Sequence, residues 1–406
     1  MRVVIIPKFD SAVASLAMAK TELRPSARAS QLKELKRART SAHNKSMMKD
    51  TLEAVKDHGL KTIAPGKKQL PVTGAVFVDT ADTSIAKLKA DMPLHHVVPD
   101  YALSLIPPVK SGLAAVKATT KLDLWHLSAI NLLQARAFGF TGKGEGITVA
   151  VLDTGIAKVP EIKGRVDRAV EFDADKQSWK EIPTKDTEGH GTHVAGLIAG
   201  SNVGVAPASK LVNVLMLPGG SGNLSDFILA IEYVSQSPDI ALMNMSAGIE
   251  GYHPEMRPAI TALRAVGVLP LVAVGNEGRN RSRSPGNYAE VVSVGASTPA
   301  NAVASFSSGG RMIVDGMTFP IPDLVAPGEG VYSCVMGGGY EAWNGTSMAT
   351  PIVSGIAALM IEKYPDILIT DLEQQLLDAC VTLGAPPERQ GAGLAQVPAS
   401  LWKSNV

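Results

Sequence analysis

The stretch Asn344-Gly345-Thr346-Ser347-Met348-Ala349-Thr350-Pro351 places a serine in a turn of small residues, directly before the apolar run Ile352 to Met360. The run predicts a buried helix with Ser347 at its N-terminus. Unpaired backbone N–H groups and the positive end of the helix dipole favour negative charge there. A serine hydroxyl is almost fully protonated at neutral pH, so it attacks a carbonyl only with a base and a group that orients that base. The function of the chain therefore depends on whether the sequence supplies these partners.

Upstream of this stretch, continuous apolar runs predict strands that are buried on both faces. They are Gly146 to Leu152, Leu211 to Leu217, Ala241 to Met245, Val268 to Val274 and Val291 to Val294. Helical stretches lie between several of them, at residues 193–199, 224–235 and 256–266. Strands that alternate with helices predict an α/β fold with a doubly wound, mostly parallel sheet. In such a sheet the functional site forms at the carboxyl ends of the strands.

Polar residues appear where these elements end or begin. The first strand ends in Asp153-Thr154-Gly155, a helix opens with Gly189-His190-Gly191-Thr192-His193, and a later strand ends in Gly275-Asn276-Glu277-Gly278. Each residue alone is ordinarily a cap or a turn residue. A zinc site on His190 and His193 is an alternative, but the spacing suggests no third ligand. Together with Ser347, these positions supply a complete set for acyl transfer.

In this hypothesis Ser347 Oγ attacks an acyl carbon, and neutral His190 takes the proton and later gives it to the leaving amine. Asp153 holds the imidazole in the required tautomer and stabilises the imidazolium. The side-chain amide of Asn276 and the backbone N–H of Ser347 donate hydrogen bonds to the oxyanion of the tetrahedral intermediate.

The three motifs around Asp153, His190 and Ser347, in this order, resemble the signature motifs of the subtilisin-like serine proteases (subtilases). The segment around Asn276 is similar to the oxyanion-hole segment of that family. The resemblance runs from about Trp125 to Leu394. It implies a subtilisin-like fold and a serine endopeptidase that hydrolyses peptide bonds through an acyl-enzyme intermediate.

The resemblance also implies two substrate-binding segments. Gly220, Ser221 and Gly222 resemble the edge segment that pairs with substrate as an added β-strand. Ser246, Ala247 and Gly248 resemble the segment that lines the first specificity pocket. The implied substrate is an extended segment of a protein or peptide. The second segment contains no acidic residue that would require a basic side chain, so we expect a broad or apolar preference.

The first part of the chain predicts a small α+β domain over residues 1–101. Strands are expected at residues 3–6, 72–78 and 95–99, a helical region at 10–60 divided at Pro25, and a short helix at 83–90. Residues 1–120 contain 19 Lys/Arg and 10 Asp/Glu, whereas residues 121–406 contain 20 and 28. These opposite charges either favour docking of the two parts or reflect a solvated basic face.

By the same resemblance, residues 1–101 form a propeptide-like domain that acts as an intramolecular inhibitor. Val97-Val98-Pro99-Asp100-Tyr101 resembles the end of such a domain. Residues 102–121, which show no clear period, are predicted to be a linker that contains an autoprocessing site, and residues 122–406 the catalytic domain. The rival hypothesis is a plugged, catalytically silent subtilase scaffold that acts as a binding or regulatory protein.

Several partners and cofactors are disfavoured. The basic run from Lys33 to Arg39 has no interleaved aromatic residues, so nucleic acid is not expected as a partner. No run approaches the length of a membrane helix. Without a recognisable signal peptide we expect a cytoplasmic monomer, or a secreted protein if a leader has been removed. Many subtilases bind calcium in a loop after the HGTH motif, but the loop here is short and offers only Asn202, so no cofactor is expected and only weak calcium binding stays open.

Overall fold

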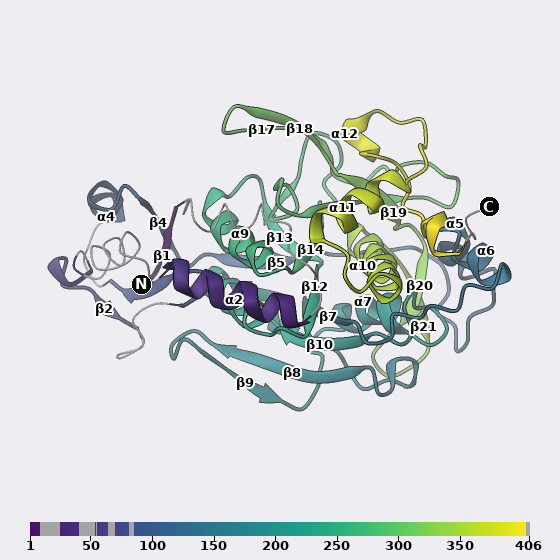
Figure 1. Ribbon diagram of the computed structural model, residues 1–406, viewed down its shortest axis with the longest axis horizontal. Coiled ribbons are helices and arrows are strands. Elements are labelled where there is room, and N and C mark those ends of the chain that lie inside the picture. Colours follow the sequence, from purple (N-terminus) through teal and green to yellow (C-terminus); the bar gives the residue numbers. More distant parts are fainter. Residues whose placement is uncertain (9–24, 40–52, 54, 64–69, 81–84, 403–406) are drawn as a thin grey trace.

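The computed structural model describes residues 1–8, 25–39, 53, 55–63, 70–80 and 85–402, and Figure 1 shows a small N-terminal domain beside a larger domain. Within this described part no helix is both long enough and apolar enough to span a membrane.

The larger domain is built on the predicted parallel sheet. Its strand order is β19-β16-β14-β12-β7-β10-β8-β9, and all neighbours are parallel except the edge pair β8 and β9. The strands are β7 (Thr148–Asp153), β8 (Val166–Asp173), β9 (Ser178–Ile182), β10 (Lys210–Leu215), β12 (Ile240–Met245), β14 (Leu269–Ala273), β16 (Val292–Ser297) and β19 (Leu324–Pro327). The predicted doubly wound α/β fold is therefore confirmed.

Helices cover both faces of this sheet, because alternate residues of each central strand point to opposite sides. In β7, Val149 and Val151 join the apolar core formed with α7 (His190–Ala199) and α10 (Thr346–Lys363). The intervening residues of β7 join a second core. That core contains α8 (Leu224–Ser235) and α9 (Arg257–Ala265). The serine stretch thus opens a buried helix, as predicted.

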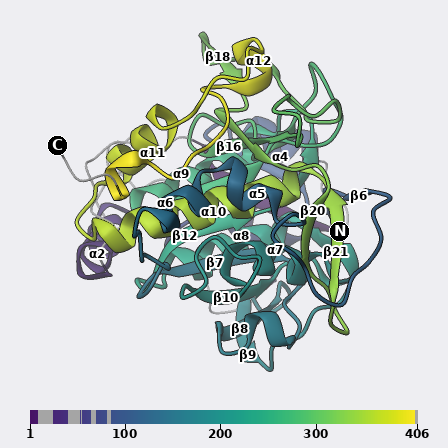
Figure 2. The same ribbon diagram turned by 90° about the vertical axis from the view of Figure 1, so that its right-hand side faces the viewer.

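Shorter elements complete this domain. Figure 2 shows it from the end at which α5 and α6 lie. The elements are α5 (Trp125–Ala129), α6 (Leu132–Ala137), α11 (Ile369–Asp378), α12 (Pro387–Gln390), the 3₁₀ turns Pro160–Ile162, Pro218–Gly220, Pro254–Met256 and Ala399–Leu401, and the hairpin β17 (Gly310–Val314) and β18 (Met317–Ile321).

The N-terminal domain is an antiparallel sheet with helices, in the order β2-β3-β1-β4. Its elements are β1 (Arg2–Pro7), α2 (Pro25–Arg39), β2 (Lys61–Thr62), β3 (Val76–Asp79), α4 (Ile85–Asp91) and β4 (His95–Pro99). The strand predicted at 72–78 begins only at Val76, because residues 71–73 form a turn. Residues 10–24 and 40–52 of the predicted helical region lie outside the described residues.

The N-terminal domain packs on the face of the larger domain that carries α8. Glu232 of α8 is fully buried, and its carboxylate accepts hydrogen bonds from the backbone N–H groups of Val72 (3.0 Å) and Thr73 (2.8 Å). A buried carboxylate is stable only when such donors replace water. Arg28 of α2 is also buried and donates to the Pro238 carbonyl oxygen at 2.6 Å, and an ion pair joins Arg2 to Asp175.

The linker prediction for residues 102–121 is wrong in part, because this segment contains two strands. β5 (Ala102–Leu105) lies between β11 (Ser221–Asn223) and β13 (Ala247–Glu250), in a sheet that ends with β15 (Arg283–Ser284). β6 (Val109–Lys110) pairs with β21 (Tyr340–Asn344), which pairs with β20 (Val331–Cys334). Leu103 and Leu105 are buried and alternate with exposed residues, the period of a half-buried strand.

Candidate active site

Ser347 lies in the first turn of α10 and is fully buried. The neighbouring Asn276 is fixed by this helix start, because its carbonyl Oδ1 accepts hydrogen bonds from Thr346 N (2.9 Å) and Thr346 Oγ1 (3.0 Å). These contacts assign the other end of the amide as the NH₂ group. Nδ2 faces the cleft and donates to the Pro107 carbonyl oxygen at 3.2 Å. The predicted nucleophile and oxyanion donor are thus held by one helix terminus.

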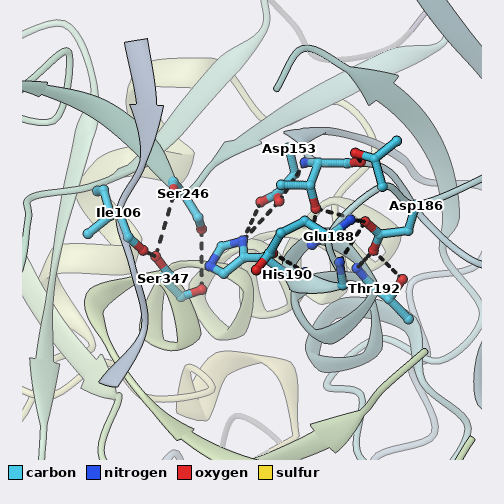
Figure 3. A network of polar contacts seen from close by, with 12 residues as sticks. Ile106, Asp153, Asp186, Glu188, His190, Thr192, Ser246 and Ser347 are labelled. Atoms are coloured by element: carbon cyan, nitrogen blue, oxygen red, sulfur yellow. Dashed lines mark hydrogen bonds and ion pairs between the residues drawn. The ribbon is translucent and has the colours of Figure 1, made fainter. Parts of the chain in front are cut away.

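His190 begins α7, and Asp153 ends β7. The two side chains are fully buried, and His190 Nδ1 lies 2.8 Å and 3.0 Å from the two carboxylate oxygens of Asp153 (Figure 3). This contact favours the tautomer in which Nδ1 carries the proton and Nε2 is a base. Gly191 permits the close approach, since a Cβ there would lie 2.0 Å from the Gly155 carbonyl oxygen.

Asp186 positions the two segments that carry Asp153 and His190, and this role was not predicted from the sequence. Its carboxylate accepts hydrogen bonds from Thr154 Oγ1 beside Asp153 and from the backbone N–H groups of Gly189 and Thr192, all at 2.9 Å. It therefore ties the end of β7 to the first turn of α7 (Figure 3). An acidic side chain shortly before a predicted helix start is an N-cap signal, which could have identified it.

The substrate-binding segments predicted from the sequence meet around β5. Ser221 lies opposite Ser104, and Gly222 lies opposite Leu103. On the other side, Ala247 lies opposite Leu105, and Gly248 opposite Ser104. Gly220 forms no pair in this ladder and ends the turn before β11. Ser246 instead contacts Ser347, because its Oγ donates to the Ser347 carbonyl oxygen at 3.2 Å.

The chain that fills this cleft, residues 102–108, is named the cleft segment. Ser347 Oγ is 3.4 Å from the carbonyl oxygen of Ile106, whereas Asn276 donates to the carbonyl oxygen of the next residue, Pro107. Acyl transfer needs both groups on one carbonyl. His190 Nε2 has no hydrogen-bond partner among the described residues. The cleft segment is therefore bound like a substrate strand but is not aligned for attack.

The chain continues across the other side of Ser347. Val109 lies opposite Asn344, and Lys110 lies opposite Trp343. Ser111 Oγ then donates to the Ala342 carbonyl oxygen at 2.6 Å. The site is thus occupied on both the acyl side and the leaving-group side.

His193, the second histidine of the motif, supports the site rather than holding a ligand. Its ring stacks on Trp343 with centroids 4.2 Å apart, and Nε2 lies 3.0 Å from the Glu341 carbonyl oxygen. Burial lowers the pKa of His193 to about 3. Among the described residues there is no cluster of three or more His, Cys, Asp or Glu that could hold a metal ion.

A pH prediction concerns His126, which is fully buried beside the Val203 carbonyl oxygen. Burial lowers the pKa of His126 to about 4 in the folded protein, below the ordinary value of 6.5. The folded state then binds fewer protons, so the stabilisation is complete above pH ~6.5 and is lost as the pH falls towards ~4. Between these two pH values, one such buried histidine lowers the free energy of unfolding by on the order of 1.4 kcal/mol for each unit by which the pH falls.

The measurement is the free energy of unfolding in urea at pH 7, 5.5 and 4.5, for His126→Gln and the parent in a Ser347→Ala background. Buried Asp323, whose pKa burial raises to about 7, acts in the opposite direction in both proteins and cancels in the difference. We expect the parent to lose stability more steeply than His126→Gln on acidification. If the free energy of unfolding depended on pH equally steeply in both proteins, the role of the buried imidazole would be contradicted.

Comparison with known proteins gives a consistent result. Residues 144–393, more than half of the chain, match the model of the subtilase family. The chain is 36% identical over 281 residues to an intracellular serine protease of Paenibacillus polymyxa, which covers 65% of this chain and 83% of that protein. It is 35% identical over 282 residues to Subtilisin Savinase of Lederbergia lenta, covering 68% and 97%. It is also 34% identical over 306 residues to Alkaline elastase YaB of a Bacillus strain, covering 74% and 76%.

Proposed function

The chain belongs to the subtilase family and is a serine endopeptidase that acts on proteins or peptides, and we propose that Asp153, His190 and Ser347 are its catalytic triad. The observation that carries this proposal is the fully buried contact between His190 Nδ1 and Asp153 beside the helix start that bears Ser347.

In the proposed reaction, Nε2 of His190 takes the proton of Ser347 Oγ as this oxygen bonds to the substrate carbonyl carbon. The developing oxyanion accepts hydrogen bonds from Asn276 Nδ2 and from the backbone at Ser347. His190 then gives its proton to the leaving amine, which departs as the acyl-enzyme forms. Water, deprotonated by His190, releases the acid in the second half of the reaction.

The N-terminal domain is the intramolecular inhibitor of this site. Its last strand leads directly into the cleft segment, and Asp100 between them caps α8 by accepting a hydrogen bond from Ser225 N at 2.8 Å. Glu232 provides a second buried contact. Autoprocessing within residues 102–121 would release this domain. Cleavage directly after Ile106 or Pro107 would be slow, because in each case the leaving nitrogen belongs to a proline ring.

The test of this proposal is the mass of purified full-length protein after long incubation. The active protein should lose an N-terminal fragment that ends between residues 102 and 121, while Ser347→Ala should stay intact. Identical intact masses for both proteins would contradict autoprocessing. The occupied cleft favours one second candidate, a permanently plugged scaffold with a regulatory role, which predicts that identical result and no hydrolysis by either protein.

The short loop after α7 does not fit a calcium site. Both carboxylate oxygens of Glu161 face hydrogen-bond donors of this loop: Oε1 accepts from Asn202 N (2.6 Å) and Val203 N (2.9 Å), and Oε2 accepts from Asn202 Nδ2 (2.8 Å). The loop is therefore organised by a carboxylate that is already satisfied, and it directs N–H groups where a cation would need oxygen atoms.

We expect EDTA to change kcat/KM by less than about twofold, because this loop does not depend on calcium. Glu161→Gln should instead lower the free energy of unfolding by about 2–4 kcal/mol, because an NH₂ group would replace a buried acceptor. Thermal unfolding of Glu161→Gln and of its parent, both in a Ser347→Ala background, measures this loss of stability. Glu145→Gln is the matched control, because Glu145 is exposed. Rapid inactivation by EDTA that calcium reverses would overturn the prediction.

A further inference from the structure

One wall of the cleft carries an arginine that contacts the cleft segment. Arg283 lies in β15, which pairs with β13 on the far side from β5. Its side chain is only 14% exposed and forms an ion pair with Glu277, with Nε 2.7 Å from Oε1. Nη1 lies 3.1 Å from the Gly248 carbonyl oxygen and 3.5 Å from Ser104 Oγ. The guanidinium therefore reaches across β13 to a side chain of the bound strand.

The orientation of this guanidinium is fixed by its neighbours. The second oxygen of Glu277 accepts a hydrogen bond from Ser308 Oγ at 3.1 Å, and Glu277 N donates to the same hydroxyl at 2.9 Å. Because the immobilised carboxylate binds Nε, the Nη1 end faces Gly248 and Ser104. Gly248 keeps this path short, since a Cβ there would lie 3.3 Å from Arg283 Cβ and 2.5 Å from the Ser284 carbonyl oxygen.

The surrounding wall is positively charged. The loop that follows Asn276 contains Arg279, Arg281 and Arg283 but only one acid, Glu277. Arg281 pairs with Glu250 of β13, with Nε 2.9 Å from Oε1. These pairs engage both acids, so the loop and its partner strand together carry one arginine more than acids. A carboxylate extends further from the backbone than a serine hydroxyl and would meet the guanidinium directly.

We propose that Arg283 determines specificity for the substrate residue that lies opposite Gly248, favouring an acidic side chain and disfavouring Lys or Arg. In the cleft segment this residue is Ser104. Counting back from Ile106 as the residue whose carbonyl Ser347 attacks, it is the third residue on the acyl side. The inference rests on the proposed protease function and adds a charge preference that the segment Ser246 to Gly248 alone did not indicate.

The test uses full-length protein and peptide substrates that differ only at this third position, which carries Asp, Ser or Lys, with the cleavage point read by mass spectrometry. We expect kcat/KM to fall in the order Asp, Ser, Lys, with a ratio of about tenfold between Asp and Lys. Arg283→Gln should reduce this ratio to about unity. Arg311→Gln, which removes an exposed arginine from the β17–β18 hairpin, should keep the ratio. When the charge is moved to the fifth position of the peptide, the ratio for wild type should fall to about unity.

The outcomes are distinguishable. No hydrolysis of even the Ser peptide by protein whose N-terminal fragment has been lost, as shown by its mass, would refute the protease function itself. Hydrolysis with equal rates for the Asp and Lys peptides would overturn the role of Arg283 and leave that function intact. Should Arg283→Gln fail to fold, salt provides a test on wild type alone: raising NaCl from about 50 mM to about 500 mM should shrink the Asp-to-Lys ratio. A ratio that does not change with salt would overturn the inference.

Discussion

Ser347→Ala is expected to lower kcat/KM for a peptide substrate by about 10⁴- to 10⁶-fold. The substitution removes the only atom that forms the acyl bond in the proposed mechanism. The contacts that position Asn276 run through Thr346 and stay in place, as does the pair of His190 and Asp153. When both proteins are compared in the intact form, before processing, the loss should therefore appear in kcat, with little change in peptide binding. Initial rates with a fluorogenic peptide at saturating and subsaturating concentrations separate the two effects.

A fluorophosphonate probe gives a second readout, because an activated serine oxygen displaces its fluoride and becomes phosphonylated. Wild type should be labelled at Ser347, and Ser347→Ala should carry no label. Ser128→Ala is the matched control, since Ser128 is exposed on α5 and lies outside the proposed machinery. A peptide rate in Ser347→Ala within tenfold of wild type would refute the assignment of the nucleophile. Absence of label from every form would favour the plugged scaffold.

The parallel sheet and the placement of the residues of the proposed triad could be predicted because their signals are local. Asp153 and His190 stand beside glycines, at the end of a buried strand and at the start of a helix respectively, so each motif carries its own structural context. The direction of a parallel sheet then brings such ends together. The position of Ser347 at the start of a helix could be predicted from the apolar run that follows it alone.

The occupant of the cleft could not be predicted in the same way. β5 is short, and its partners in β11 and β13 are more than a hundred residues away in the sequence. The alternation of Leu103 and Leu105 is too brief to outweigh the prolines that follow. Arg283 was missed for the same reason, because its role depends on reaching across β13 to another strand rather than on any spacing in its own loop.

The double substitution Leu103→Asp/Leu105→Asp is expected to raise the initial kcat/KM of full-length protein by at least about tenfold. Both leucines are buried in the core that also contains Leu217 and Ala247. Placing carboxylates there costs several kcal/mol in addition to the lost apolar burial. Every ~1.4 kcal/mol lost from cleft binding changes the open-to-closed ratio about tenfold. Rates must be read before processing occurs, with intact mass confirmed in the same sample.

Leu122→Asp is the matched control, because Leu122 is 91% exposed and lies beyond the cleft segment. It should leave the rate unchanged. An unchanged rate in the double variant, with normal folding by circular dichroism, would contradict inhibition by the cleft segment.

The size of the increase reports how the segment is held. The cleft segment is tethered, so it competes with peptide at a high effective concentration. Weaker binding of the segment therefore opens the site only when the loss of binding free energy outweighs the effect of this high local concentration. Glu232 and Arg28 hold the N-terminal domain through contacts remote from the cleft. Loss of the two leucines should therefore free the cleft while the domain stays docked. A buried Glu232→Gln change, by contrast, should loosen the domain and raise the rate less, because β5 keeps its own pairing with β11 and β13.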